Sequence, residues 1–173
     1  YVFDVTGAIK MADDLAIKKE EYLSSTGPNT QKLREEIKAE EEKIRKMLRK
    51  KNYEADSVDY RVNFASVFTK NGGFDIILAN PPYIDSESMT NQDKKLRKKI
   101  QSNYSFTKGN WDIYIPFIEL GFRLKNSRGV IIYITPDKWV SKPFGDQLRV
   151  ETIMNISSVS VFGRDTFESV NVD

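Results

Sequence analysis

The sequence predicts an α/β fold, in which a mostly parallel sheet carries helices on both faces and a helical hairpin precedes it. Short, almost wholly apolar runs at 74–79, 129–135 and 156–162 alternate with segments of helical periodicity. Residues 1–60 lack such runs and resemble two charged amphipathic helices. We therefore expect a helical hairpin or insertion over 1–60 and an α/β part over 61–173.

The hairpin is predicted from spacing and from one turn. Residues 8–23 place apolar side chains at helical intervals, and the run SSTGPN then breaks the pattern. Asn29 or Thr30 is placed to cap the second helix. Glu40 interrupts the apolar stripe of that helix, which comprises Leu33, Ile37, Ile44 and Met47. The mixed charges favour a solvated helical surface over a nucleic-acid arm.

The remaining elements follow in order along the chain. FDIILA at 74–79 has the composition of a strand buried on both faces of a parallel sheet. Residues 111–125 carry a thick apolar stripe at helical spacing, and 129–135 form a second apolar strand. A weaker helix is expected over 144–154, followed by a third strand at 156–162. In such sheets ligands bind at the carboxyl ends of the strands.

Composition excludes several kinds of chemistry. The 173 residues include 27 Lys+Arg and 25 Asp+Glu but no Cys or His. Disulfides, Cys or His zinc sites and histidine-activated nucleophiles are therefore excluded, and no carboxylate spacing predicts a metal site. The net charge of +2 argues neither for nor against a polyanionic partner. With no long apolar run and no signal-peptide pattern, a cytoplasmic protein is expected.

The most informative segment directly follows the first strand and reads Asn80-Pro81-Pro82-Tyr83. Two prolines make it rigid and leave only carbonyl acceptors on their backbone, while Asn80 adds an amide oxygen. Such a pair of acceptors, at the Asn80 side chain and the Pro81 carbonyl, suits the exocyclic amine of adenine. They would stabilise positive charge on that nitrogen as it attacks an electrophile. Tyr83 would stack on a base taken out of its duplex.

FDIILANPPYI resembles the catalytic motif of Rossmann-like amino-methyltransferases that use S-adenosylmethionine. GNWDIYIPFIELGFRLK and GVIIYITPDKWVSKPFGDQLR are similar to the segments that follow this motif in adenine-N6 DNA methyltransferases. DYRVNF at 59–64, followed by VF at 67–68, resembles the lead-in of type IIG restriction–modification enzymes, which also carry a charged helical insertion. The resemblance implies the C-terminal half of a Rossmann-like methyltransferase sheet, acting on double-stranded DNA.

The sequence also departs from that family. None of its nine glycines forms the Gly-x-Gly of the cofactor loop, so the main S-adenosylmethionine loop and its acidic ribose ligand have no counterpart here. The chain is therefore expected to be a fragment that is inactive alone. Two alternatives remain open: a methyltransferase acting on protein glutamine or RNA through the same loop, and a non-catalytic binding module that keeps NPPY as a turn.

Further residues have weaker assignments. The resemblance implies that Phe117 would contact the cofactor adenine, although its place on the apolar stripe favours the core. Trp139 is expected to pack in the core or a lid, and Asp112 to cap a helix. A basic run a few residues after NPPY would contact DNA phosphates or form a solvated helix, and it comprises Lys94, Lys95, Arg97, Lys98 and Lys99.

Overall fold

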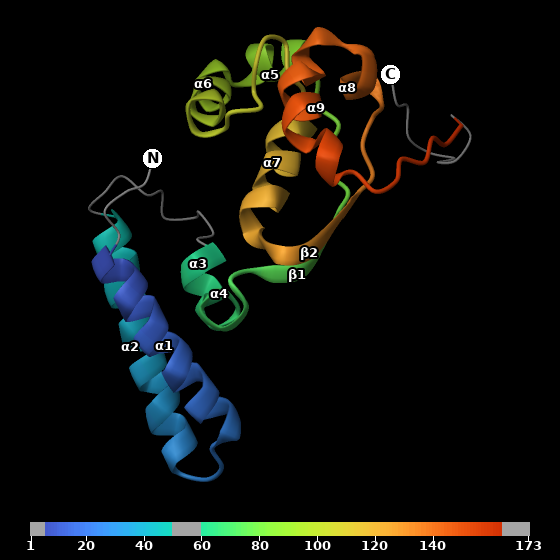
Figure 1. Cartoon of the computed structure of the whole chain (residues 1–173). Helices are drawn as coiled ribbons and strands as arrows, with labels where there is room; N and C mark the ends of the chain where they lie inside the picture. Colours follow the sequence, from blue (N-terminus) through green and yellow to red (C-terminus); the bar gives the residue numbers. More distant parts are fainter. Residues whose placement is uncertain (1–5, 50–59, 164–173) are drawn as a thin grey trace. The chain divides into compact units, whose positions relative to one another are not determined.

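The computed structural model describes residues 6–49 and 60–163, and these fall into two compact units (Figure 1). The first unit contains residues up to Asp75 together with Leu124–Gly129, and the second contains Ile76–Arg123 and the residues from Val130 onward. The elements, in chain order, are α1 Thr6–Ser24, α2 Asn29–Arg49, α3 Tyr60–Asn63, α4 Ala65–Asn71, β1 Phe74–Ala79, α5 Ser86–Gln92, α6 Lys94–Asn103, α7 Tyr114–Leu124, β2 Lys125–Tyr133, α8 Lys138–Ser141, the 3-10 turn Pro143–Gly145, α9 Asp146–Thr152 and the 3-10 turn Ile153–Asn155.

The helical hairpin forms as predicted, with α1 and α2 side by side in Figure 1. Leu15 of α1 packs with Ile37 and Ile44 of α2 in a buried cluster. Glu40, which interrupts the apolar stripe, accepts a hydrogen bond of 2.5 Å from Lys18 Nζ. This contact raises the pKa of Lys18. Met47 was expected on the buried stripe but is 38% exposed.

A close backbone approach fixes the start of β1 within the first unit. Helix α4 ends at Asn71 and is capped by Gly72, which adopts the left-handed conformation with φ of 70°. A Cβ on Gly73 would lie 2.5 Å from the Leu124 carbonyl oxygen, so only glycine fits there. Ala12 and Ala16 of α1 pack with Ala65 of α4 in a cluster of small side chains.

The two strands pair in one sheet, and their direction is parallel. Gly129 lies against the Phe74 carbonyl, and Ile134 N–H donates to Ala79 O at 3.2 Å. The two residue numbers differ by the same amount in both contacts, as they do when paired strands run in the same direction. The chain between the strands contains α5, α6 and α7, and α7 is the helix that the alternating pattern predicts. The mixed helix–strand architecture agrees with the predicted partial Rossmann-like α/β fold.

The expectation that β1 is buried on both faces is wrong for the described residues. Ile76 and Leu78 are 69% and 74% exposed, and Val130 and Ile132 of β2 are also exposed. Side chains alternate between the two faces of a strand, so these residues share one open face. The Tyr133 hydroxyl, in contrast, donates to a carbonyl of α7, which covers the other face.

The predicted third strand at 156–162 does not form in the structure. These residues have no regular secondary structure and are mostly exposed, with Val161 at 79% and Phe162 at 65%. A strand needs a hydrogen-bonded neighbour, and within the described parts the sheet contains only β1 and β2. The helix expected over 144–154 is present as α9 and its flanking 3-10 turns, with Leu148 buried in the core of the second unit.

Candidate functional site

The NPPY loop leaves β1 at the carboxyl edge of the sheet and is anchored at both ends. Ala79 O, just before the loop, accepts from Ile134 N, which continues the ladder beyond the last residue of β2. Just after the loop, Ile84 O accepts from Ile113 N at 3.0 Å. Two long-range backbone bonds therefore bracket four residues, two of which are prolines with fixed φ.

Within this loop, Tyr83 and Asn80 contact each other. The Tyr83 hydroxyl donates to Asn80 Oδ1 at 2.8 Å, and the Ile134 carbonyl lies 3.4 Å from the same hydroxyl. Asn80 and Pro82 are exposed, Pro81 is buried and Tyr83 is half-buried. Burial raises the pKa of the Tyr83 phenol, so it stays protonated and keeps its donor. A carbonyl oxygen has two lone pairs, so Asn80 Oδ1 keeps capacity for a second donor.

Two carboxylates follow the loop and bond backbone amides. Asp85 caps α5 by accepting from Ser88 N at 2.7 Å, and this bond is the main reason that its pKa is lowered. Asp112 was expected to cap the helix that follows it. Its carboxylate instead accepts from Ser86 N at 3.1 Å, because Ile113 is held against Ile84 and turns Asp112 toward α5. Burial raises the pKa of Asp112.

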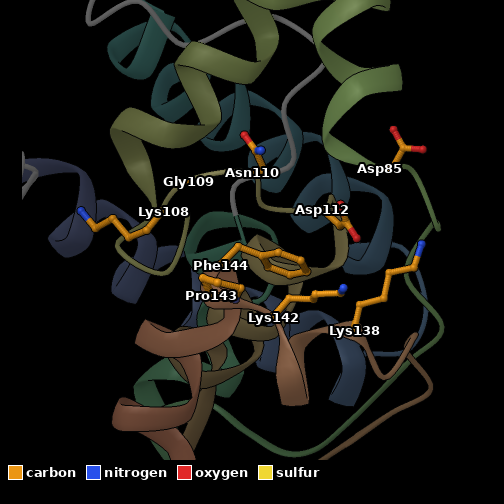
Figure 2. A pocket seen from close by; sticks show the side chains of 9 residues that line it. All are labelled: Asp85, Lys108, Gly109, Asn110, Asp112, Lys138, Lys142, Pro143 and Phe144. Carbon is orange, nitrogen blue, oxygen red and sulfur yellow. The ribbon is translucent and has the colours of Figure 1, made fainter.

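A cavity of about 570 Å³ opens beside these carboxylates (Figure 2). In Figure 2 the Phe144 ring lies between Asn110 and Lys142, and the Lys138 side chain extends toward Asp85. The residues that border it come from three places: the start of α5, the loop after α6 and the segment after β2. They are Asp85, Lys108, Gly109, Asn110, Asp112, Lys138, Lys142, Pro143 and Phe144. Sequence reasoning did not single out these lysines, because they are separated along the chain.

The basic run forms α6, and the structure separates one of its members from the others. Arg97 is half-buried and donates to Trp111 O and Gly109 O, each at 3.1 Å. Its guanidinium lies 4.3 Å from the Trp111 ring centroid. Desolvation lowers the pKa of Arg97. The side chain therefore holds the loop that borders the cavity, whereas the four exposed members are Lys94, Lys95, Lys98 and Lys99.

Comparison with known proteins identifies the group to which these features belong. Residues 9–163 match the family described as Eco57I restriction-modification methylase. The chain belongs to this family. No solved structure matches it significantly.

The curated relatives are type II methyltransferases, one of which is also a restriction enzyme. The chain is 33% identical over 78 residues to type II methyltransferase M.PaeR7I of Pseudomonas aeruginosa, a match that covers 45% of this chain and 13% of that protein. It is 33% identical over 76 residues to type II methyltransferase M.BstVI of Geobacillus stearothermophilus, covering 44% and 13%. It is 30% identical over 76 residues to type II restriction enzyme and methyltransferase RM.Eco57I of Escherichia coli, covering 44% and 8%. The matched segments thus span a small part of these relatives.

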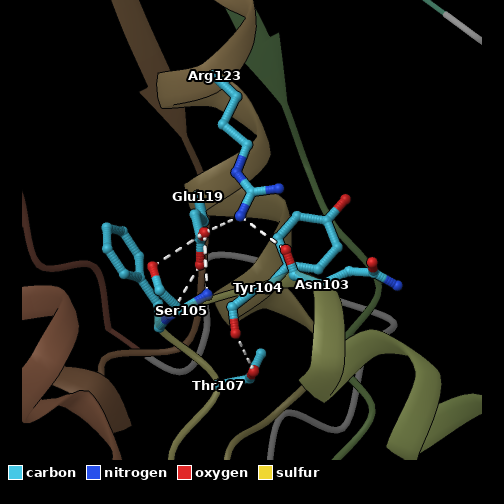
Figure 3. Close-up of polar contacts among 7 residues, drawn as sticks. Asn103, Tyr104, Ser105, Thr107, Glu119 and Arg123 are labelled. Carbon is cyan, nitrogen blue, oxygen red and sulfur yellow. Dashed lines mark hydrogen bonds and ion pairs between the residues drawn. The ribbon is translucent and has the colours of Figure 1, made fainter. Parts of the chain in front are cut away.

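One buried acid, Glu119, was not predicted from the sequence to have a role. Glu119 is 4% exposed and accepts from Ser105 N, Ser105 Oγ and Phe106 N at 3.0, 3.1 and 2.7 Å (Figure 3). Arg123 also pairs with Glu119 and stacks on Tyr104. The signal was a glutamate inside the apolar run IPFIELGF, because a buried charge needs partners. This network fixes the segment that leads into Lys108 and Gly109.

The other predicted residues lie on α7 and α8. Trp139 is half-buried and packs against the core of the second unit. Phe117 is 37% exposed, so one face of its ring is open although it lies on the mainly apolar α7. Within the described ranges, no cluster of three or more acidic side chains could hold a metal ion. No described helix is long and apolar enough to cross a membrane.

Proposed function

We propose that this chain is the catalytic-loop part of an S-adenosylmethionine-dependent DNA methyltransferase that modifies the N6 amine of adenine. The observation that carries the proposal is the NPPY loop, held at both ends at the carboxyl edge of a parallel sheet. Membership of a restriction-modification methylase family supports it. Residues 1–60 would be a helical insertion and 61–173 the partial catalytic domain, in a cytoplasmic enzyme that acts on double-stranded DNA.

Asn80 and Pro81 would bind the substrate amine. The N6 lone pair of adenine is delocalised into the ring, so this amine is a weak nucleophile. Asn80 Oδ1 and the Pro81 carbonyl would accept its two hydrogens and stabilise positive charge as the new N–C bond forms. A proton then leaves the nitrogen to solvent. This chemistry needs neither a histidine base nor a cysteine nucleophile.

Pro82 and Tyr83 would position the base. Pro82 keeps the loop rigid, since its φ is fixed. Tyr83 presents a half-buried ring whose hydroxyl is already bonded, so the ring orientation is set before the base arrives. Stacking of a base on an aromatic ring contributes about 1–3 kcal/mol and offsets part of the cost of flipping.

The cofactor would contact this chain at two residues, Phe117 and Asn80. Phe117 exposes an aromatic face that suits an adenine ring, and Asn80 offers polar atoms at the sheet edge. S-adenosylmethionine, when bound, would supply the methyl group by breaking its sulfur–methyl bond, leaving S-adenosylhomocysteine as the second product. Because the sequence contains no Gly-x-Gly loop, we expect this chain alone to show no methyl transfer.

The exposed lysines of α6 would bind DNA phosphates. Lys94, Lys95, Lys98 and Lys99 all project from a helix that begins two residues after α5 ends. Each phosphate contact would contribute to a salt-dependent affinity. Arg97 would support them by holding the helix to the neighbouring loop.

The decisive experiment substitutes Asn80 in the protein at its full natural length. Asn80→Ala should lower methyl transfer to duplex DNA by roughly 100- to 1,000-fold, the loss that follows when one oriented hydrogen-bonding group that stabilises transition-state charge is removed. Asn71→Ala is the matched control, because Asn71 is exposed at the end of α4. The modified base should be N6-methyladenine. Methylated protein glutamine or RNA, with unmodified DNA, would refute the DNA assignment, and full activity of Asn80→Ala would refute the catalytic role.

A further inference from the structure

The cavity beside the NPPY loop contains two lysines that the proposed chemistry does not use. Lys138 begins α8 and Lys142 directly follows it, so both belong to the short segment after β2. Within the described residues, neither ammonium group forms an ion pair or a hydrogen bond. Both border the same cavity of about 570 Å³. Their charges therefore face a space large enough for a ligand, since small-molecule sites measure roughly 300–1,000 Å³.

The carboxylates of the cavity do not neutralise these lysines completely. Asp85 and Asp112 each accept a backbone N–H, from Ser88 and Ser86 respectively. The charge of Lys138 acts on both carboxylates at longer range. With Lys108 also on the rim, three positive charges border the cavity against two negative ones. The excess charge and the unpaired ammonium groups favour an anionic ligand.

An aromatic ring lies in the same cavity. Phe144 is half-buried, with part of its surface packed against the core cluster of Trp111 and Leu148. The ring lies beside Lys142 in Figure 2. Proteins that bind single-stranded nucleic acid place aromatic rings next to basic side chains, because the phosphates bind cations and the bases stack on the rings.

The position of the cavity connects it to the catalytic loop. Asp85 borders the cavity and lies two residues after Tyr83. The Ile84–Ile113 backbone bond holds residues 83–85 beside the segment of Asn110 and Asp112, which also borders the cavity. We propose that the cavity binds the nucleotide of the DNA strand next to the target adenine, with its phosphate at Lys138 and Lys142 and its base against Phe144. This inference rests on the proposed function.

The salt dependence of DNA binding tests the phosphate contact. Unmodified duplex DNA that contains the sequence methylated by the enzyme is titrated into the full-length protein over a range of KCl concentrations. Each phosphate neutralised contributes about 0.7–0.9 to the slope of log K against log salt. Lys138→Gln combined with Lys142→Gln removes the contact to one phosphate and should therefore reduce that slope by about 0.7–0.9. Lys43→Gln combined with Lys46→Gln, on the exposed side of α2, is the matched control and should leave it unchanged.

Two further variants keep the test independent of folding. Lys138→Arg combined with Lys142→Arg retains the charges and should keep the slope of the unmodified protein. Phe144→Leu should weaken DNA binding roughly five- to 150-fold without changing the slope, because it removes stacking and no charge. Phe144→Tyr keeps the ring and should bind like the unmodified protein. A slope that does not change in the Lys138/Lys142 pair, or that falls equally in the control pair, overturns the inference.

Failure of this inference and failure of the proposed function give different results. If DNA adenine is methylated but the slope does not depend on Lys138 and Lys142, the cavity assignment alone is wrong. If the slope depends on them but DNA receives no methyl group, the proposed reaction is wrong and the cavity remains a nucleotide site.

Discussion

The hydroxyl of Tyr83 donates to the side-chain oxygen of Asn80 at 2.8 Å, across the two prolines that separate them. The bond fixes which way the Asn80 amide faces, because its oxygen must point to the donor. The ring that would stack on the base and the amide that would bind the amine are therefore positioned together.

Substitutions at Tyr83 should separate these two roles. Tyr83→Phe removes the hydroxyl and keeps the ring, so single-turnover methyl transfer should slow by about fivefold, equivalent to a hydrogen bond of about 1 kcal/mol. Affinity for DNA should not change. Tyr83→Ala should in addition weaken binding by about 1–3 kcal/mol through lost stacking. Equal losses of binding in both variants would contradict the role given to the hydroxyl.

The close contact between α7 and β2 predicts a stability effect at Gly121. A Cβ there would lie 2.6 Å from Tyr133 Oη, which itself donates to Phe117 O at 2.9 Å. Gly121→Ala should destabilise the second unit by about 1–3 kcal/mol in urea unfolding, because the tyrosine must move. Adding Tyr133→Phe should recover part of this loss, although the ring carbon at 3.2 Å remains close.

The control for this pair is Gly163→Ala, since a Cβ at Gly163 would meet no atom within 4 Å. If Gly121→Ala and Tyr133→Phe are strictly additive, the two positions do not contact in solution.

The elements whose signals are local were predicted from the sequence. The helical hairpin, the two strands and the rigid NPPY loop all follow from periodicity, proline and turn residues close together in the chain. The first strand forms at 74–79 as predicted, whereas the second, predicted at 129–135, forms over 125–133. The prediction of a third strand at 156–162 was wrong, because an apolar run becomes a strand only when a neighbouring strand supplies hydrogen bonds. The open face of β1, with Ile76 and Leu78 exposed, likewise depends on what packs against it.

The site was predictable only in its contiguous part. The NPPY loop could be read directly, and its anchors at Ile113 and Ile134 could not, because they are distant in sequence. The basic run was recognised as a group, but one-dimensional reasoning could not single out Arg97 as the member that folds back onto Trp111. The lysines of the cavity were missed for the same reason.

Glu119 should be important for stability because its carboxylate is buried with four partners. Glu119→Ala should cost about 3–5 kcal/mol of unfolding free energy, since it leaves the Ser105 and Phe106 amides and the Arg123 charge without their acceptor. Glu119→Gln should cost less, because one oxygen still accepts. Glu87→Ala, on the exposed side of α5, should change stability by no more than about 1 kcal/mol. Comparable losses at the two glutamates would show that the buried network is not stabilising.

Arg97 should control the order of the loop after α6, independently of any phosphate contact. A lysine at this position cannot donate to the carbonyls of Gly109 and Trp111 while stacking on the indole, since its ammonium is a point charge. Arg97→Lys should therefore accelerate hydrogen exchange at the loop amides of Asn110 and Trp111 and leave the salt slope of DNA binding nearly unchanged. Lys98→Ala, one residue further along α6, should do the opposite, lowering the slope by about 0.7–0.9 and leaving exchange unchanged. Unaltered exchange in Arg97→Lys would show that the guanidinium does not hold this loop.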